Sequence, residues 1–421
     1  MKNKCLIYLF ILVSLLFSAI SCSPKKTSGN EIKIGVILPI TGSNKTINQE
    51  IRYGIDFAVD LINNDYDLPV FFGKNKGLPA HNNAKIKVIY RDFGDNREEV
   101  IQIVDDLVKK DKVSLLIGCY LSSATAFASE RAELHEIPFF NFTSTSPTLN
   151  KRGLRYFFRT TADDELYSSN FFDFLNRQYE IKPFPKRIVL VYENSIWGTN
   201  VAQSEIRFAN ENGYKIVQEI SYDYLRFSPD VYLDQIKKAM PAIIMHASYE
   251  IDAVKWVDFY IKNDINPIGI LAMNAGFSSP YFKKALGRKA DNIISRENWV
   301  PDLAKNNQLR SIINKLFLSK YSESFNGNSA RAFTGMICVA DILNRSNSFS
   351  PDDILKSSHK TNLASQNLIM PWKGIRFNKE GQNILSDGII VQMQNQEYYT
   401  VWPDSLAFKK VVWPKPKWKA D

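Results

Sequence analysis

From residue 31 onward the sequence alternates short apolar strands with amphipathic helices, and this alternation limits the fold more than any other feature. The first strand is predicted at 31–38, where alternating residues give way to a fully apolar run, and a helix with one apolar face follows at 49–63. Such an apolar strand is typical of a sheet that helices cover on both faces. Strands that alternate with helices form right-handed crossovers, so the pattern predicts an α/β fold with parallel sheets.

The alternation restarts after Thr160, which predicts a second unit of the same kind. In the first unit, further strands are expected at 86–91, 113–118 and 138–142, with helices at 97–110 and 122–135. In the second, strands are expected at 187–192, 214–221, 242–245, 267–271 and 292–295, with helices at 164–178, 197–212, 229–239 and 251–263. Helices at 307–321, 330–344 and 351–356 and short strands near 375–377, 388–393 and 398–402 follow. A chain of 421 residues is also too long for one core.

Residues 1–22 have the features of a secretory signal peptide. Lys2 and Lys4 precede an apolar run that is too short to span a bilayer, and small residues follow it. The sequence Ala-Ile-Ser-Cys at 19–22 resembles a bacterial lipobox, in which the cysteine becomes the lipidated N-terminus. We therefore predict a lipid on Cys22 and a polar tether over 23–31, with a conventional signal peptide cut near Ser21 as the alternative.

Composition and motifs argue against several classes of function. The excess of 53 basic over 44 acidic residues is too small for a nucleic-acid binder of this length. The four His and four Cys show no metal-ligand spacing, and no phosphate loop, dinucleotide turn or nucleophile elbow occurs. Acidic pairs at 98–99, 105–106 and 163–164 are expected at helix starts or surfaces. We predict no enzyme, metal or cofactor, and buried free thiols at Cys119 and Cys338.

Two turns at predicted strand ends carry clusters of hydroxyl groups. Ser122 and Ser123 begin the helix after strand 113–118, and Thr143 and Thr145 follow strand 138–142. Ligands of parallel α/β sheets dock at the carboxyl ends of the strands, where helix N-termini present free N–H groups. Hydroxyl and N–H donors together suit a carboxylate. The alternative is that these residues are ordinary helix caps.

Three stretches of the first unit resemble a known family. They are IKIGVILPITG at 32–42, IRYGIDFAVDLIN at 51–63 and the segment from 111 to 149 that contains LLIGCYLSSATAF and IPFFNFTSTSP. They resemble the N-terminal lobe of type I periplasmic binding proteins, most of all the Leu/Ile/Val-binding proteins of ABC transporters. The resemblance continues through RIVLVYENSIWGTNVAQ and reaches WKGIRFNKEGQ near the end. It implies two doubly wound lobes joined by three chain crossings, with an N-terminal lobe of 32–161 plus about 298–375 and a C-terminal lobe of 162–297 plus about 376–421.

The resemblance also implies roles for individual residues. Ser122 matches the serine that binds the ligand carboxylate, Thr143 a residue that uses its backbone there, and Thr145 a threonine whose hydroxyl joins it. From the second lobe it implies contacts by Trp197, by Ser248 or Tyr249, and by Asn274. Asn274 stands where the family has the acid that pairs with the ligand's α-ammonium, and Asn carries no charge. Glu193, Glu250 and Asp252 are the alternative acids, or else helix caps and surface charges.

Together these observations predict a lipid-anchored substrate-binding protein of an ABC importer, in the cell envelope and facing the periplasm or the outside. Its partners would be a small-molecule ligand, the transmembrane permease subunits and the membrane that holds the anchor, with no nucleic acid. The ligand is expected to be an amino acid or a similar small carboxylate, captured by hinge closure. Because Asn274 cannot neutralise an ammonium, we expect a small carboxylate, amide or aromatic acid to bind at least as well as Leu, Ile or Val. A sensory module reporting to a membrane receptor, or an envelope enzyme or enzyme regulator, are the alternatives.

Overall fold

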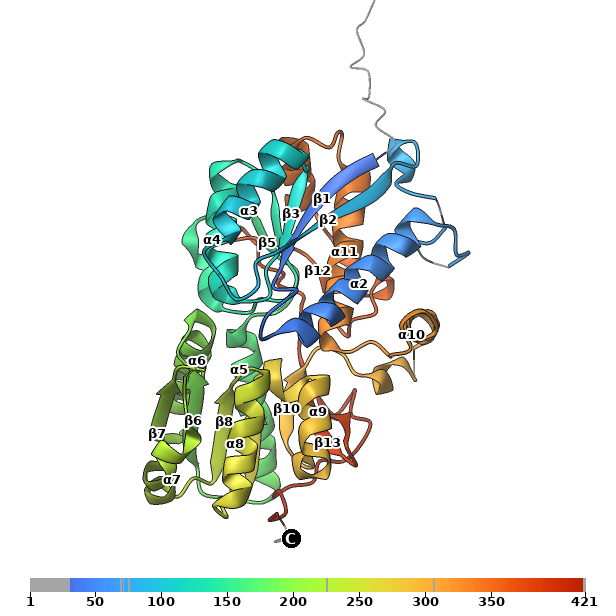
Figure 1. Ribbon diagram of the computed structural model, residues 1–421. Coiled ribbons are helices and arrows are strands. Elements are labelled where there is room, and N and C mark those ends of the chain that lie inside the picture. Colours follow the sequence, from blue (N-terminus) through green and yellow to red (C-terminus); the bar gives the residue numbers. More distant parts are fainter. Residues whose placement is uncertain are drawn as a thin grey trace, which may run out of the picture.

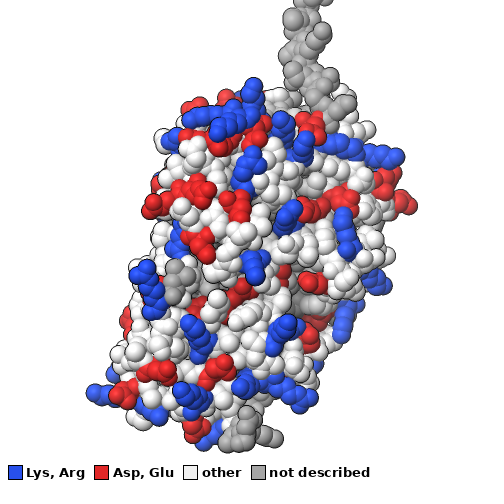
Figure 2. Space-filling model, viewed as in Figure 1, with Lys and Arg blue, Asp and Glu red and all other residues white. Residues whose placement is uncertain are grey.

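The computed structural model describes residues 31–68, 70, 72–74, 76–224, 226–305 and 307–418. The predicted signal peptide, the lipobox with Cys22 and nearly all of the tether lie outside these residues. The described chain forms two lobes, each with a central sheet and helices packed against it (Figure 1). Lys and Arg are interspersed with Asp and Glu over both lobes on the face shown in Figure 2.

The N-terminal lobe is built on a five-stranded parallel sheet with the order β2-β1-β3-β4-β5. Its strands are β1 (Glu31–Leu38), β2 (Lys85–Asp92), β3 (Leu115–Gly118), β4 (Phe139–Asn141) and β5 (Phe157–Arg159). The connecting helices are α2 (Lys45–Asn63), α3 (Val100–Asp106), which a π-helical turn extends over Leu107–Asp111, and α4 (Ser122–Leu134). The sequence did not predict β5, because three residues are too few to show a strand period.

The C-terminal lobe has a seven-stranded sheet with the order β14-β13-β10-β9-β8-β6-β7. The parallel strands are β6 (Arg187–Glu193), β7 (Lys215–Tyr222), β8 (Ile243–Ala247), β9 (Gly269–Ala272) and β10 (Ile294–Glu297). The helices are α5 (Asp164–Ile181), α6 (Ile196–Glu211), α7 (Leu233–Ala239), α8 (Glu250–Lys262) and α9 (Pro280–Leu286). Two late strands extend this sheet: β13 (Ile389–Gln394) pairs antiparallel with β10, and β14 (Glu397–Trp402) pairs antiparallel with β13. Helix α9 was not predicted from the sequence.

Later segments of the chain return to the N-terminal lobe and link the two lobes. Helices α10 (Gln308–Tyr321), α11 (Gly327–Arg345) and α12 (Pro351–His359) follow β10, and the short antiparallel pair of β11 (Leu363–Ala364) with β12 (Gly374–Ile375) precedes β13. Helix α11 packs on α2, and the chain crosses between the lobes after β5, after β10 and after β12 (Figure 1). The predicted α/β fold of two lobes with three crossings is therefore confirmed.

Both described cysteines are buried and free, as the sequence predicted. Cys119 lies at the end of β3 and Cys338 inside α11, and burial raises the pKa of both thiols. A thiol with a raised pKa holds little reactive thiolate at neutral pH. In the part of the chain that the structure describes, no helix is long and apolar enough to cross a membrane.

Candidate functional site

A cavity lies between the lobes, at the carboxyl ends of the parallel strands of both sheets. Its lining residues are Tyr120, Ser122, Thr143, Ser144 and Thr145 from the N-terminal lobe, Trp197, Tyr249, Asn274, Ala275 and Arg296 from the C-terminal lobe, and Arg331 from α11. The cavity has a volume of about 20 Å³, little more than one water molecule requires. The lobes also touch directly: Ser146 Oγ donates to Asn200 Oδ1 at 2.5 Å, and Arg97 Nη2 donates to Tyr224 Oη at 2.5 Å. The structure is therefore a closed arrangement of the lobes.

Ser122 is the first residue of α4 and faces this cavity from the end of β3. The residue before it, Leu121, begins the helix without any side-chain cap, so the N–H groups of the first turn have no side-chain acceptor. Among the described residues, none forms a hydrogen bond with the Ser122 hydroxyl, and the side chain is not a helix cap. Ser123 is buried next to it but does not line the cavity. Of the two serines, only Ser122 is placed to reach a ligand.

The turn after β4 is shaped by Asn141. Its Oδ1 accepts the N–H groups of Thr143 and Ser144 at 3.0 and 2.9 Å, and its Nδ2 donates to the Ser144 carbonyl at 2.9 Å. The Ser144 hydroxyl bonds to Thr125 Oγ1 at 2.6 Å and lies 2.6 Å from the Cys119 carbonyl, so it ties this turn to the turn after β3. The two hydroxyl-bearing turns that the sequence predicted therefore form one rigid surface.

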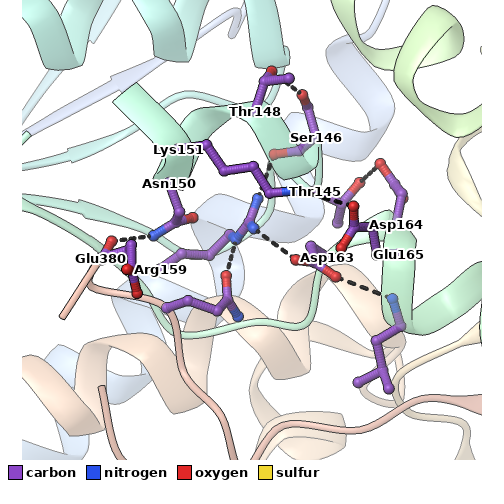
Figure 3. A network of polar contacts seen from close by, with 12 residues as sticks. Thr145, Ser146, Thr148, Asn150, Lys151, Arg159, Asp163, Asp164, Glu165 and Glu380 are labelled. Carbon is purple, nitrogen blue, oxygen red and sulfur yellow. Dashed lines mark hydrogen bonds and ion pairs between the residues drawn. The ribbon is translucent and has the colours of Figure 1, made fainter. Parts of the chain in front are cut away.

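The acidic pair at 163–164 lies at the start of α5, one of the two places predicted for it, but Asp164 is not solvated. Asp163 does cap α5 by accepting the Leu166 N–H at 3.0 Å, but Asp164 is fully buried beneath Thr145. The Thr145 hydroxyl donates to Asp164 Oδ2 at 2.9 Å (Figure 3). Burial raises the pKa of Asp164 to about 6, although the nearby Arg296 guanidinium opposes that rise. The pair looked like a plain helix start because the sequence does not show that Thr145 packs over it.

Arg159 organises the crossing between the lobes just behind Thr145. Its guanidinium is fully buried, and it donates to the Ser146 carbonyl at 2.7 Å and to Gln382 Oε1 at 2.5 Å, with Asp163 Oδ2 at 3.4 Å. Figure 3 shows this network joining the turn after β4, the start of α5 and the segment that carries Glu380. The first and third crossings are thus held together beside the candidate site.

The C-terminal lobe faces the hydroxyl groups with aromatic rings. Trp197 lies in the first turn of α6 and Tyr249 precedes α8, and their ring centroids are 5.0 Å apart. Tyr249 also lies 6.3 Å from the ring of Tyr120 in the other lobe. Ser248 is buried, receives a hydrogen bond from the Tyr222 hydroxyl at 2.7 Å and does not line the cavity. Of Ser248 and Tyr249, only Tyr249 lines the cavity.

Asn274 follows β9 and lines the cavity with an amide that is already engaged. Its Nδ2 donates to Glu297 Oε1, and Glu297 Oε2 accepts the Asn298 N–H at 3.0 Å. Asn274 adopts φ = 56° and ψ = −123°, the angles of the first central residue of a type II′ turn, a position in which Gly, Asn and Asp predominate. Glu297 does not line the cavity. Glu297, the acid that Asn274 contacts, therefore lies behind the Asn274 amide and outside the cavity lining.

The alternative acids named from the sequence lie outside the cavity lining, and two of them, Glu193 and Asp252, are hydrogen-bonded elsewhere. Glu193 accepts the N–H groups of Ser195 and Gly198 at 2.7 and 2.8 Å, as a cap of α6 would. Asp252 accepts the Tyr222 hydroxyl at 2.5 Å, and burial raises the pKa of Glu250 to about 7. None of the three lines the cavity. Two of them are caps, but all three are buried rather than exposed on the surface.

Sequence reasoning missed two arginines of the cavity, Arg296 and Arg331. Arg296 lies in β10, directly after the predicted strand 292–295, and a charged residue at the carboxyl end of a buried strand was an available signal. Arg331 comes from α11, which no local pattern connects to the turn after β4. Of the eight ligand-binding residues predicted, Ser122, Thr143, Thr145, Trp197, Tyr249 and Asn274 line the cavity, and Ser123 and Ser248 do not.

Known proteins are similar to this chain in sequence and in fold. The "Leu/Ile/Val-binding protein homolog 8" of Brucella abortus is 23% identical over 393 residues, which cover 91% of this chain and 94% of that protein. Among solved structures, the branched-chain amino acid transporter substrate-binding protein of Streptococcus pneumoniae, in complex with isoleucine, gives a TM-score of 0.73 at 21% identity and covers 87% of this chain and 97% of its own. A solute-binding protein of an ABC transporter from Rhodopseudomonas palustris, in complex with 3,4-dihydroxybenzoic acid, gives a TM-score of 0.73 at 15% identity. The match covers 91% of this chain and 99% of that protein.

The family assignment rests on a match along most of the chain. The sequence profile of the family described as periplasmic binding proteins matches residues 31–397. That range includes both lobes and all three crossings, and it confirms the resemblance inferred from the N-terminal motifs. This chain belongs to the periplasmic binding protein family.

Proposed function

We propose that this protein is the lipid-anchored, extracytoplasmic substrate-binding protein of an ABC importer, and that it captures a small solute bearing a carboxylate. The observation that carries the proposal is the convergence of Ser122, Thr145 and the first turn of α4 on a closed cavity between two lobes. The relatives and structural neighbours named above are solute-binding proteins, and isoleucine and 3,4-dihydroxybenzoic acid both carry a carboxyl group. We also propose the predicted lobe boundaries near 161, 297 and 375, since β5, β10 and β12 end at 159, 297 and 375.

The proposed mechanism divides the ligand contacts between the lobes. The Ser122 hydroxyl and the free N–H groups of α4 would hold the carboxylate, because hydrogen bonds to an ionised acceptor at a helix N-terminus are strong. Trp197 and Tyr249 would cover the apolar part of the solute when the lobes meet. We propose binding rather than catalysis because no described His bonds to the hydroxyls of the lining.

Replacing Ser122 or Thr145 by Ala should weaken binding by about ten- to a hundredfold. Ser122→Ala removes a free donor to the carboxylate, and Thr145→Ala removes a hydroxyl that would turn from Asp164 to donate to the ligand. A thermal-shift screen of the purified protein against amino acids and small carboxylic acids identifies a compound, and calorimetry then compares the variants. Ser123→Ala is the matched control, because Ser123 lies in the same helix turn outside the cavity. Unchanged affinity in both Ser122→Ala and Thr145→Ala would remove these residues from the site.

The lipid anchor is tested separately from ligand binding. In Cys22→Ala, the acceptor of the lipid is absent, so the protein should move from the membrane fraction to the soluble fraction of the envelope. Cys5→Ala is the control, because Cys5 lies in the segment that cleavage removes, and its protein should stay with the membrane. A Cys22→Ala protein that remains membrane-bound would contradict the anchor.

A further inference from the structure

Arg296 occupies an unusual position in the cavity. Arg296 is the third residue of β10, a strand in the interior of the seven-stranded sheet, and it is only 3% exposed. It lines the cavity from the C-terminal lobe, opposite the hydroxyl groups of Ser122 and Thr145. A guanidinium ion is among the groups that cost most to bury, so its partners decide what it does there.

The hydrogen-bond donors of Arg296 are largely unused. Two of its nitrogens, Nε and Nη1, are buried and have no hydrogen-bond partner among the described residues. The third, Nη2, lies 3.8 Å from Asp164 Oδ1, which is beyond hydrogen-bond distance. The guanidinium instead stacks on the ring of Tyr167, 3.9 Å from its centroid. Stacking fixes the plane of the guanidinium and leaves its edges free to donate.

Arg331, in the same cavity wall, provides an internal comparison. It is as deeply buried, but all three of its nitrogens donate: Nε to the Gly327 carbonyl at 3.2 Å, Nη1 to the Thr143 carbonyl at 2.9 Å and Nη2 to Asn328 Oδ1 at 2.7 Å. Arg331 therefore supports the wall from behind. Arg296 lacks such partners, and the place from which an acceptor can come is the cavity that it lines.

No carboxylate of the described residues lines the cavity, and the nearest one to Arg296, Asp164, reaches it only through a 3.8 Å ion pair. Two arginines line the cavity, and no Asp or Glu is among its described lining residues. Asp164 already accepts the Thr145 hydroxyl, and Glu297 accepts from Asn274 and Asn298. A ligand ammonium in the closed cleft would meet a guanidinium and no lining acid, whereas an anionic group would meet the unused Nε and Nη1 donors of Arg296.

We propose that Arg296 is a ligand-binding residue that donates to an anionic group of the solute, and that the protein therefore selects an organic acid without an α-ammonium over the corresponding α-amino acid. This inference rests on the proposed function and narrows its substrate class. Arg296 would act from the C-terminal lobe, so its hydrogen bonds form only when the lobes close. An anionic ligand would then stabilise the closed arrangement of the lobes through Arg296.

Pairs of compounds that differ only in the α-ammonium test this proposal, for example 4-methylpentanoate with leucine and phenylacetate with phenylglycine. Calorimetry on the wild-type protein should show the acid of a pair binding at least about tenfold more tightly than the amino acid. Arg296→Met should lose that preference and weaken binding of the acid by about a hundredfold. Arg288→Met, the same change at an exposed position of the same lobe, should leave the affinity as it is.

The stability of the ligand-free protein gives a second, independent readout. Arg296 makes one long ion pair, with Asp164, and no hydrogen bond among the described residues, so Arg296→Met removes a costly buried charge, and the melting temperature without ligand should be unchanged or higher. A lower melting temperature together with unchanged affinity would show that Arg296 is a structural partner of Asp164 and would overturn the proposal. Tight, Ser122-dependent binding of the amino acids alone would overturn it while leaving the proposed function intact. Binding of no compound in either set would tell against both.

Discussion

Replacing Glu50 by Gln should stabilise the protein at alkaline pH and leave it nearly unchanged at pH 5. Glu50 is buried in α2, where Oε2 accepts from Asn328 Nδ2 at 2.9 Å and Oε1 has no partner among the described residues. Burial raises the pKa of this carboxyl group from 4.5 to about 8. The folded protein thus binds a proton that the unfolded chain releases, and this contribution to stability is lost as the pH rises from about 4.5 to about 8.

The expected effect follows from the size of that shift. Gln keeps an oxygen that can accept from Asn328 and does not titrate, so the difference in unfolding free energy between Glu50→Gln and wild type should grow by roughly 3–5 kcal/mol between pH 5 and pH 8.5. Denaturant unfolding at both pH values measures it. Asp252, whose pKa burial raises to about 7, titrates in both proteins and cancels in the difference. Glu31→Gln, at an exposed position, is the control. An unfolding free energy that changes by the same amount between pH 5 and pH 8.5 in Glu50→Gln and in wild type would contradict the prediction.

A methyl group at Gly54 should destabilise the N-terminal lobe strongly. Gly54 lies in α2 where that helix crosses α11, and a Cβ built on it would overlap the backbone oxygen of Ser329. Ala is otherwise the better helix former by about 1 kcal/mol, but overpacking between two backbones costs more. We expect Gly54→Ala to lower the unfolding free energy by about 2–3 kcal/mol.

Denaturant unfolding checks this prediction against a substitution on the open face of the same helix. Gln49→Ala lies at an exposed position of α2 and should be neutral or slightly stabilising. A Gly54→Ala protein as stable as wild type would mean that α2 and α11 do not touch at Gly54. The consequence reaches the site, because Arg331 and Asn328 belong to the part of α11 that this crossing positions.

The sequence predicted the fold well because local patterns encode strands, helices and their alternation. The strand at 31–38 and the hydroxyl-bearing turns at 122 and 143–145 could be predicted because residues adjacent in the chain form the pattern. Strand β5 and helix α9 were missed, whereas β4 and α7, which are equally short, lie within the longer predicted segments 138–142 and 229–239.

The site residues could be predicted only where the polar side chains directly follow a predicted strand. Ser122 and Thr145 follow strands directly, so their place at the sheet edge could be inferred from sequence. Burial of Asp164 depends on Thr145, 19 residues away, and the contact of Arg331 with Thr143 joins residues 188 apart. The Nε and Nη1 donors of Arg296 are unused because no acceptor of the described residues lies within reach, and only the packed structure shows this.

The most direct test of a carboxylate site between the lobes is a crystal structure of the protein with the tightest compound from the screen. We expect the compound between the lobes, with its carboxylate within hydrogen-bond distance of the Ser122 and Thr145 hydroxyls. A compound bound outside the cavity lined by Ser122, Thr145 and Trp197, or held there without any acidic group near Ser122, would contradict the account.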